Sequence, residues 1–167
     1  MAVARTRIVA YPLVRENPYQ QLLYAALEAH GFTVIEGNLH LRWLWRNRRH
    51  ARVLHFHWPQ SWYVHPRQPG GPLTAIKLAR FAVQLTVARL LGYLIAWTIH
   101  EVYPLKPAAR WADRAGGRVL ARAARVLLAN DRETADRARA ELGHAADRIE
   151  VVPHPSYVGA YPPGRPR

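Results

Sequence analysis

Histidines stand at the ends of several short apolar runs, where an imidazole could do chemistry. His55 and His57 flank Phe56 in the segment HFHWP, His100 ends the run YLIAWTIH, and His154 lies in VVPHP. A neutral imidazole can ligate a metal ion, exchange a proton near neutral pH or hydrogen-bond a sugar hydroxyl. Which of these applies depends on whether the fold brings the histidines together.

The chain alternates between strand-like and helix-like patterns. Six apolar or β-branched runs predict strands, over residues 7–11, 32–36, 53–58, 93–100, 124–130 and 148–155. Helices are predicted between them, within residues 18–30, 39–52, 73–91, 108–123 and 131–142. Asn17 is expected to cap the first helix, with Gln20 completing a capping-box pattern, and Asn130 to cap the last. The segment 59–71 is rich in proline and glycine and predicts a loop.

This alternation predicts an α/β fold that is Rossmann-like, with three α/β/α layers and a mainly parallel sheet of about six strands. Residues 1–157 are expected to form one domain, followed by a proline-rich tail over residues 158–167. Ligands of such sheets bind at the carboxyl ends of the strands. We therefore expect the strand-end histidines to gather along this edge.

Several classes of site are disfavoured by what the sequence lacks. The first loop, YPLVRENP, has no GxGxxG pattern, and no GxxxxGK[ST] occurs, so neither a dinucleotide cofactor nor a P-loop is expected. There is no cysteine, and carboxylates are scarce, so no metal site and no cofactor are predicted.

His55 lies deeper in its strand and is assigned a structural hydrogen bond. His57 and Trp58 are expected to line a cleft beside His100.

The charge is strongly positive. The chain has 24 basic and 11 acidic residues and a net charge of +13, and no acidic residue occurs between Glu36 and Glu101. Four residues of the segment 39–52 form its basic, tryptophan-bearing face: Arg42, Trp43, Arg46 and Arg49. This face is either a solvated helix surface or a contact for an anionic membrane. No nucleic-acid-reading motif is present, so nucleic acid is not an expected partner. We expect a cytoplasmic protein, or one peripheral at the inner face of the cell membrane.

Four motifs in register resemble the N-terminal, acceptor-binding half of a GT-B fold glycosyltransferase. They are ENPYQQLLYAALEAHGFTV, VLHFHWP, AWTIHEVYP and VVPHPSYVGAYP, and together they cover essentially the whole chain. The sequence is most similar to bacterial family-4-like glycosyltransferases. That family typically shows a strand ending in HxHWP, a T-[VI]-H-N motif followed by a proline, and a closing PHxxY…YP.

The resemblance implies transfer of a sugar from a nucleotide-sugar to a glycan or lipid-linked acceptor, with retention at the anomeric carbon and without a metal. It makes His100 and Glu101 the catalytic residues, and Glu101 stands where the family usually has asparagine. The implied acceptor-binding residues are Arg15, Glu16, Asn17, His57, Trp58 and Tyr103. His154 and Tyr157 match the loop that leads toward the cleft between two domains.

The family binds the nucleotide-sugar mainly in a second domain, which is expected to begin after Tyr161. The chain is therefore expected to need a C-terminal half, within a longer protein or as a separate subunit, and to be inactive alone. An alternative remains open at this point. The chain could be a non-catalytic Rossmann-like module that docks on an anionic membrane or on a partner protein.

Overall fold

The sheet of this protein is wholly parallel. The structure is a computed structural model that describes residues 6–103 and 109–158. The six described strands lie in the order β2-β1-β3-β4-β5-β6, and every neighbouring pair is parallel. The strands are β1 (Thr6–Tyr11), β2 (Phe32–Ile35), β3 (Val53–Phe56), β4 (Leu94–Ile99), β5 (Val126–Ala129) and β6 (Glu150–Val151). The predicted α/β class and parallel sheet are confirmed.

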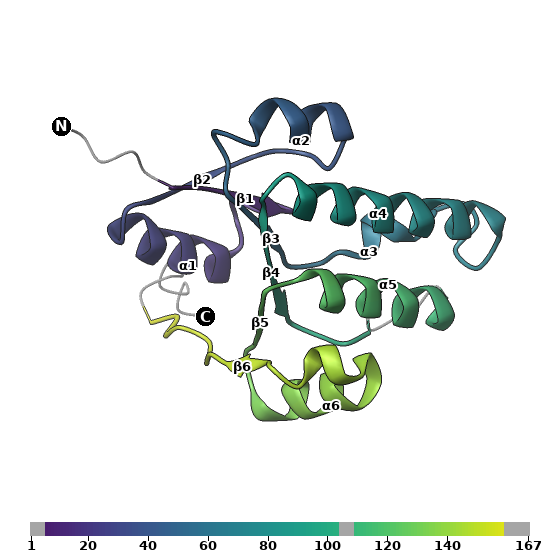
Figure 1. The fold of residues 1–167 in the computed structure, drawn as a ribbon. Helices are drawn as coiled ribbons and strands as arrows, with labels where there is room; N and C mark the ends of the chain where they lie inside the picture. The colour runs from purple at the N-terminus through teal and green to yellow at the C-terminus, as the bar shows by residue number, and fades with distance from the viewer. Residues whose placement is uncertain (1–5, 104–108, 159–167) are drawn as a thin grey trace, which may run out of the picture.

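The helices cover the two faces of the sheet unequally (Figure 1). The helix α1 (Pro18–Ala29) covers one face. The other face carries α2 (Leu41–Asn47), α4 (Pro72–Leu90), α5 (Arg110–Ala123) and α6 (Arg132–Leu142). A short helix, α3 (Gln60–Tyr63), and a 3₁₀ turn at His144–Ala146 complete the described elements. The strand order reverses between β1 and β3, and right-handed connections on either side of this point place α1 opposite the other helices.

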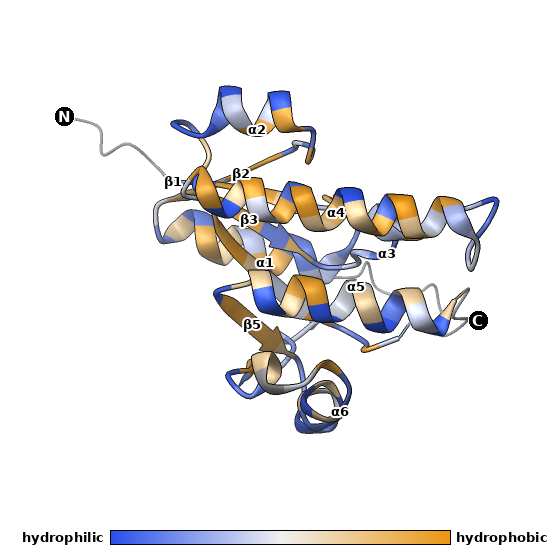
Figure 2. Cartoon of the chain, turned by 45° about the vertical axis from the view of Figure 1, so that its right-hand side comes forward, coloured by the Kyte–Doolittle hydropathy of each residue, from blue (hydrophilic) through white to orange (hydrophobic). Residues whose placement is uncertain are grey.

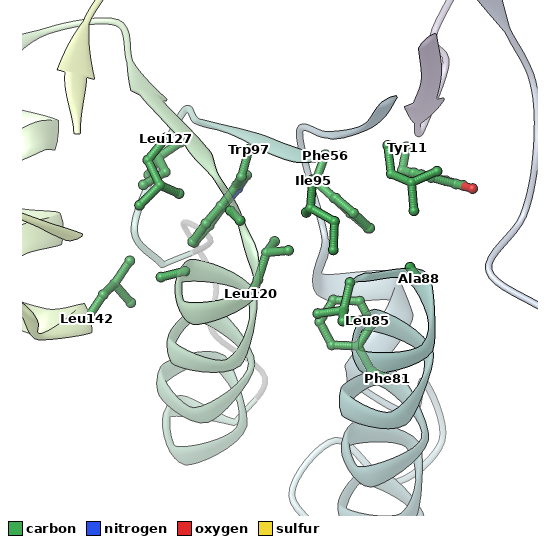
Figure 3. Packing of buried hydrophobic residues seen from close by; sticks show 14 of the residues in the cluster. Tyr11, Phe56, Phe81, Leu85, Ala88, Ile95, Trp97, Leu120, Leu127 and Leu142 are labelled. Atoms are coloured by element: carbon green, nitrogen blue, oxygen red, sulfur yellow. The ribbon is translucent and has the colours of Figure 1, made fainter. Parts of the chain in front are cut away.

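Two apolar cores follow from this arrangement. The larger one packs β3, β4 and β5 against α4, α5 and α6, and Figure 3 shows Phe56, Phe81, Leu85, Trp97 and Leu120 within it. The smaller core lies under α1. Because only one helix covers that face, polar side chains of β3 and β4 can be buried there beside it.

The helix caps were predicted correctly in part. Asn17 caps α1 by accepting a hydrogen bond from the Gln20 backbone N–H at 3.3 Å. The Gln20 side chain does not complete a capping box, because it bonds instead to the backbone of Val14 and Pro12 in the preceding loop. The predicted cap of α6 is wrong by one residue: Asp131, whose carboxylate accepts from the backbone of Thr134, occupies that position.

The basic helix α2 is rotated relative to its predicted orientation. Leu44 points into the core, and Trp43 packs inward beside it. A Cβ on Gly37 would lie 2.6 Å from the Trp43 ring, so the absence of that side chain makes room for the indole. Trp45 is the exposed tryptophan, at 57% exposure. The assignment of Trp43 to the exposed basic face is therefore wrong, whereas Arg42, Arg46 and Arg49 are exposed.

Two further differences concern the ends of segments. The predicted loop after β3 contains the single turn of α3, and the last strand is reduced from residues 148–155 to Glu150–Val151.

Hydrophilic and hydrophobic residues alternate along α4 and α5 (Figure 2). In the described part of the chain, none of the helices combines the length and the apolar character needed to cross a bilayer.

The close packing of α5 on α3 can be tested at Gly116. A Cβ there would lie 2.7 Å from three ring atoms of Tyr63, which is only 2% exposed and cannot move aside. Alanine improves helix propensity by about 1 kcal/mol, but overpacking a core costs about 1–3 kcal/mol. We expect Gly116→Ala to lower the free energy of unfolding in urea by up to about 2 kcal/mol. Gly70→Ala is the matched control, because its Cβ would meet nothing closer than 3.8 Å. An equal effect of both substitutions would contradict this packing.

Candidate functional site

Histidines from two neighbouring strands meet at the carboxyl ends of β3 and β4. His55 lies in β3 and His57 directly follows it, so strand alternation sends both side chains to the face covered by α1. In the adjacent strand, Thr98 and His100 follow the same alternation. Tyr24 of α1, which is 6% exposed, packs against the rings of His55 and His57. The predicted gathering of His57 beside His100 is thus present.

A continuous series of hydrogen bonds joins six side chains, here called the histidine chain: Thr98, His55, Tyr24, His57, His100 and Asn130. Nε2 of His55 lies 2.9 Å from the Thr98 hydroxyl, which confirms the structural hydrogen bond expected for His55. The Tyr24 hydroxyl bridges Nδ1 of His55 at 3.2 Å and Nε2 of His57 at 2.7 Å.

At its other end the histidine chain runs through His100 to Asn130, which is 7% exposed. Nδ1 of His57 lies 3.1 Å from Nε2 of His100, and Nδ2 of Asn130 lies 3.0 Å from Nδ1 of His100. The other amide atom, Oδ1 of Asn130, is buried without a hydrogen-bond partner among the described residues. This oxygen is the open end of the histidine chain.

The geometry fixes one proton position on each ring. A neutral imidazole donates from one nitrogen and accepts at the other. Asn130 donates to Nδ1 of His100, so the proton of His100 is on Nε2 and is donated to His57. The same requirement places the proton of His57 on Nε2, makes the Tyr24 hydroxyl donate to His55, and places the proton of His55 on Nε2. Moving the proton of one imidazole alone to its other nitrogen would set two donors or two acceptors against each other, so the tautomers of the three rings are coupled.

Burial keeps these imidazoles uncharged at neutral pH. It lowers the pKa of His55 to about 4, and the electrostatic effect of His100 lowers this pKa to a smaller extent. It also lowers the pKa of His57 well below its usual value. The pKa of His100 is lowered to about 4, again mainly by burial and then by His154. Burial raises the pKa of the Tyr24 phenol, so this group stays protonated and can serve as a bridge.

His100 is the histidine of the chain that reaches the surface. It is partly exposed, whereas His55 and His57 are 5% and 2% exposed. The Trp58 ring stacks on His100 with centroids 4.6 Å apart and 14° between the planes. Tyr19, itself 8% exposed, meets His100 edge to face at 4.9 Å. The exposed edge of His100 therefore lies between aromatic walls.

The loop after β6 approaches the same place. The His154 ring lies 5.1 Å from that of Tyr19 and 6.4 Å from that of His100. The Tyr157 hydroxyl lies 2.8 Å from Nδ1 of His154. The structure thus brings five of the predicted site residues into one cluster: His57, Trp58, His100, His154 and Tyr157.

Other predicted site residues lie apart from this cluster. The Arg15 guanidinium is on the surface, 3.3 Å from a carboxylate oxygen of Glu36. The Asn17 side chain is used in the α1 cap. The Tyr103 hydroxyl donates to Glu141 at 2.7 Å, between α5 and α6.

The two predicted site carboxylates differ in environment. Glu101 directly follows His100 and is partly buried, and this burial raises the pKa of its carboxyl group. Among the described residues, no hydrogen bond or ion pair joins Glu101 to His100. Glu16 is exposed in the loop before α1.

Sequence reasoning missed Tyr19, Tyr24, Thr98 and Asn130. Thr98 could have been found, because it lies two residues before His100 and must share its side of the strand. Asn130 ends the strand next to β4, which is a comparable signal. Tyr19 and Tyr24 carry no such signal, because an aromatic residue on the inner face of a helix most often serves packing alone.

No protein-family model matches this chain, and a comparison with curated proteins finds no match. Within the described residues, no three histidine or carboxylate side chains converge in the manner of a metal site. What the cluster offers is a neutral imidazole of fixed orientation, an adjacent carboxylate and the partly exposed ring of Trp58.

The bridging role of Tyr24 can be measured by removing its hydroxyl. Tyr24→Phe leaves a buried donor on His57 and a buried acceptor on His55 unpaired, each at a cost of about 1–3 kcal/mol. We expect the free energy of unfolding to fall by about 2–6 kcal/mol. Tyr93→Phe is the control, because the Tyr93 hydroxyl makes a single hydrogen bond, to the backbone of Leu44. A loss no larger than that of the control would show that the bridge is absent.

The lowered histidine pKa values also predict a pH dependence of stability. The unfolded chain protonates a histidine near its usual pKa of 6.5, whereas folded His55 and His100 resist protonation down to about pH 4. The unfolded state therefore binds more protons within this window, and stability falls as the pH is lowered through it. The slope approaches about 1.4 kcal/mol per pH unit for each such histidine.

Burial raises the pKa of the carboxyl groups of Asp113 and Glu101, which opposes part of this effect. We expect urea midpoints to decrease steadily between about pH 7 and about pH 5. His30→Gln, at an exposed position after α1, should leave the slope unchanged. A midpoint that stays constant or rises toward pH 5 would contradict the burial of neutral histidines.

Proposed function

We propose that this chain is the acceptor-binding half of a glycosyltransferase of the GT-B class. The enzyme transfers a sugar from a nucleotide-sugar to a glycan or lipid-linked acceptor, with retention at the anomeric carbon. The observation that carries this proposal is the neutral, oriented His100 at the carboxyl end of β4, the edge where parallel α/β sheets bind their ligands.

An uncharged histidine suits the transition state of sugar transfer. The anomeric carbon becomes electron-poor, with oxocarbenium-ion-like character, as the bond to the leaving group breaks. An imidazolium beside it would repel this charge, whereas a neutral ring held in place contributes a fixed dipole without reorganisation. The burial that lowers the pKa of His100 therefore supports a role next to the transferred sugar.

Glu101 supplies the negative charge in this account. Its carboxylate follows His100 in the chain, and partial burial strengthens its interaction with a developing positive charge. Trp58, which is partly exposed and stacks on His100, contributes aromatic surface, against which the apolar face of an acceptor sugar packs. The donor pyrophosphate is left to a second domain, in the same polypeptide or in a separate subunit.

Activity measurements test this proposal in two steps. We expect residues 1–167 alone to release no nucleoside diphosphate from a panel of nucleotide-sugars. Addition of the donor-binding half should restore transfer, and His100→Ala should lower kcat by about 10²–10³-fold, the range seen when one preorganised stabilising group is removed. His30→Ala, at an exposed site, should leave the rate unchanged. Turnover by the isolated chain, or full activity of His100→Ala, would refute the proposal.

A second surface supports attachment to an anionic membrane. Arg42, Arg46 and Arg49 are exposed on and beside α2. Next to them, the Arg48 guanidinium lies 3.8 Å above the exposed ring of Trp45. Exposed tryptophan with arginine is typical of interfacial binding to acidic lipids. We propose that this surface holds the enzyme at the inner face of the cell membrane. It also serves the alternative function, a non-catalytic module that docks there or on a partner protein.

Sedimentation with vesicles tests this surface. We expect binding to vesicles that contain phosphatidylserine, weaker binding as salt is raised, and little binding to neutral vesicles. Combined replacement of Arg42, Arg46 and Arg49 by glutamine should weaken binding about 100-fold, from about 1 kcal/mol for each charge. Trp45→Ala should weaken it further, while Trp111→Ala, at another exposed tryptophan, should not. Equal sedimentation with neutral and anionic vesicles would exclude membrane attachment.

A further inference from the structure

A groove of about 920 Å³ lies between α5 and α6, away from the histidine chain. Its walls carry five arginines, and we call it the arginine groove: Arg110, Arg114, Arg118 and Arg122 of α5, and Arg137 of α6. The α5 arginines recur every four residues, so their positions follow one another at about 6 Å along about 18 Å of helix. Like charges four residues apart destabilise a helix, so this series brings α5 no benefit by itself.

The positive charge of the groove is mostly uncompensated. Glu141 is the carboxylate that lines it, and this group already bonds to Arg114 at 2.6 Å and to the Tyr103 hydroxyl at 2.7 Å. Arg118 donates to the Glu141 backbone at 3.2 Å. No hydrogen bond or ion pair within the described residues holds Arg110 or Arg122. These side chains are free to meet a ligand.

The basic surface continues beyond the groove. Arg122 also lines two adjacent hollows, of about 490 and 570 Å³. Arg89 lines both of these, and Arg125 and Arg148 line the second. Cationic positions therefore extend along the whole of α5. Three adjoining hollows lined by arginines match a linear polyanion better than the flat surface of a bilayer.

We propose that the arginine groove binds a linear acidic glycan, a chain of sugars that bear carboxylates. Guanidinium groups pair with carboxylates through two parallel hydrogen bonds, which makes arginine the suitable residue. Aromatic surface for sugar rings is present at one end, where Trp111 is 46% exposed and Tyr103 lines the wall. Tyr103 follows His100 by three residues, so the chain can separate their Cα atoms by at most about 11 Å.

Because Tyr103 lines the groove and lies close to His100 along the chain, the groove leads toward the candidate site. An acidic glycan lying along α5, with its end beyond Tyr103, would bring a terminal sugar toward His100. This part of the inference rests on the proposed function, since it makes the glycan the acceptor. In this arrangement Tyr103, which was predicted to bind the acceptor, contacts the extended part of the acceptor chain. It does not contact the sugar that reacts.

Binding of a labelled oligogalacturonide to the purified chain tests the proposal by fluorescence anisotropy. The test variant combines Arg110→Gln, Arg122→Gln and Arg137→Gln, none of which removes a hydrogen bond seen in the described structure. The control variant combines Arg42→Gln, Arg46→Gln and Arg49→Gln, which lowers the net charge equally, from +13 to +10 (13 − 3). We expect the groove variant to bind at least about tenfold more weakly, with a smaller salt dependence, and the control variant to bind within about twofold of the parent.

Three results would overturn the assignment. Equal losses in both variants would show that net charge, not the groove, attracts the glycan. Equal binding of a neutral dextran oligosaccharide would exclude recognition of carboxylates. Groove-dependent binding of single-stranded DNA or of phosphatidylserine vesicles that exceeds that of the oligogalacturonide would show another polyanion to be the ligand. Since this assay needs no sugar donor, a failure of sugar transfer with groove-specific binding intact would refute the proposed function alone.

Discussion

The site depends on burying two imidazoles, and part of a third, beside α1 without burying a charge. A buried polar group is costly unless its hydrogen bonds are made, and a buried imidazolium would be costlier still. The histidine chain meets this constraint by matching each donor to one acceptor from Asn130 to Thr98. Tyr24 is the link that α1 supplies, and its two bonds tie that helix to β3. The position of α1, the tautomer of His100 and its lack of charge therefore have a common cause.

The two faces of the sheet have different tasks. On the face with several helices, residues such as Phe81, Leu85 and Leu120 form an extended apolar core that gives the domain its stability. The face with α1 alone has a small apolar core and room for the buried polar chain. The outer sides of α2, α4 and α5 carry exposed basic residues, among them Arg42, Arg80 and Arg110. Sugar chemistry, membrane contact and glycan binding are thus proposed for separate surfaces of one domain.

The sequence predicted the fold well because periodicity reports burial directly. The nearly unbroken apolar run ending at His100 could belong only to a strand covered on both faces, and β4 is that strand. Alternation likewise placed His55 and His57 on one side. Helix orientation was harder on α2, where seven residues make too few turns for a clear apolar stripe, and the space left by Gly37 draws in Trp43. The capping roles of Gln20 and Asn130 were misjudged because tertiary partners, a loop backbone and His100, compete for their side chains.

The central claim is that one coupled hydrogen-bond chain keeps His100 neutral and in a single tautomer. Long-range ¹H–¹⁵N correlation spectra of the imidazoles at neutral pH measure both properties directly. The account predicts that His55, His57 and His100 are all uncharged and all carry the proton on Nε2. Different tautomers among the three rings, rapid exchange between tautomers at His100, or a protonated His100 at neutral pH would contradict it.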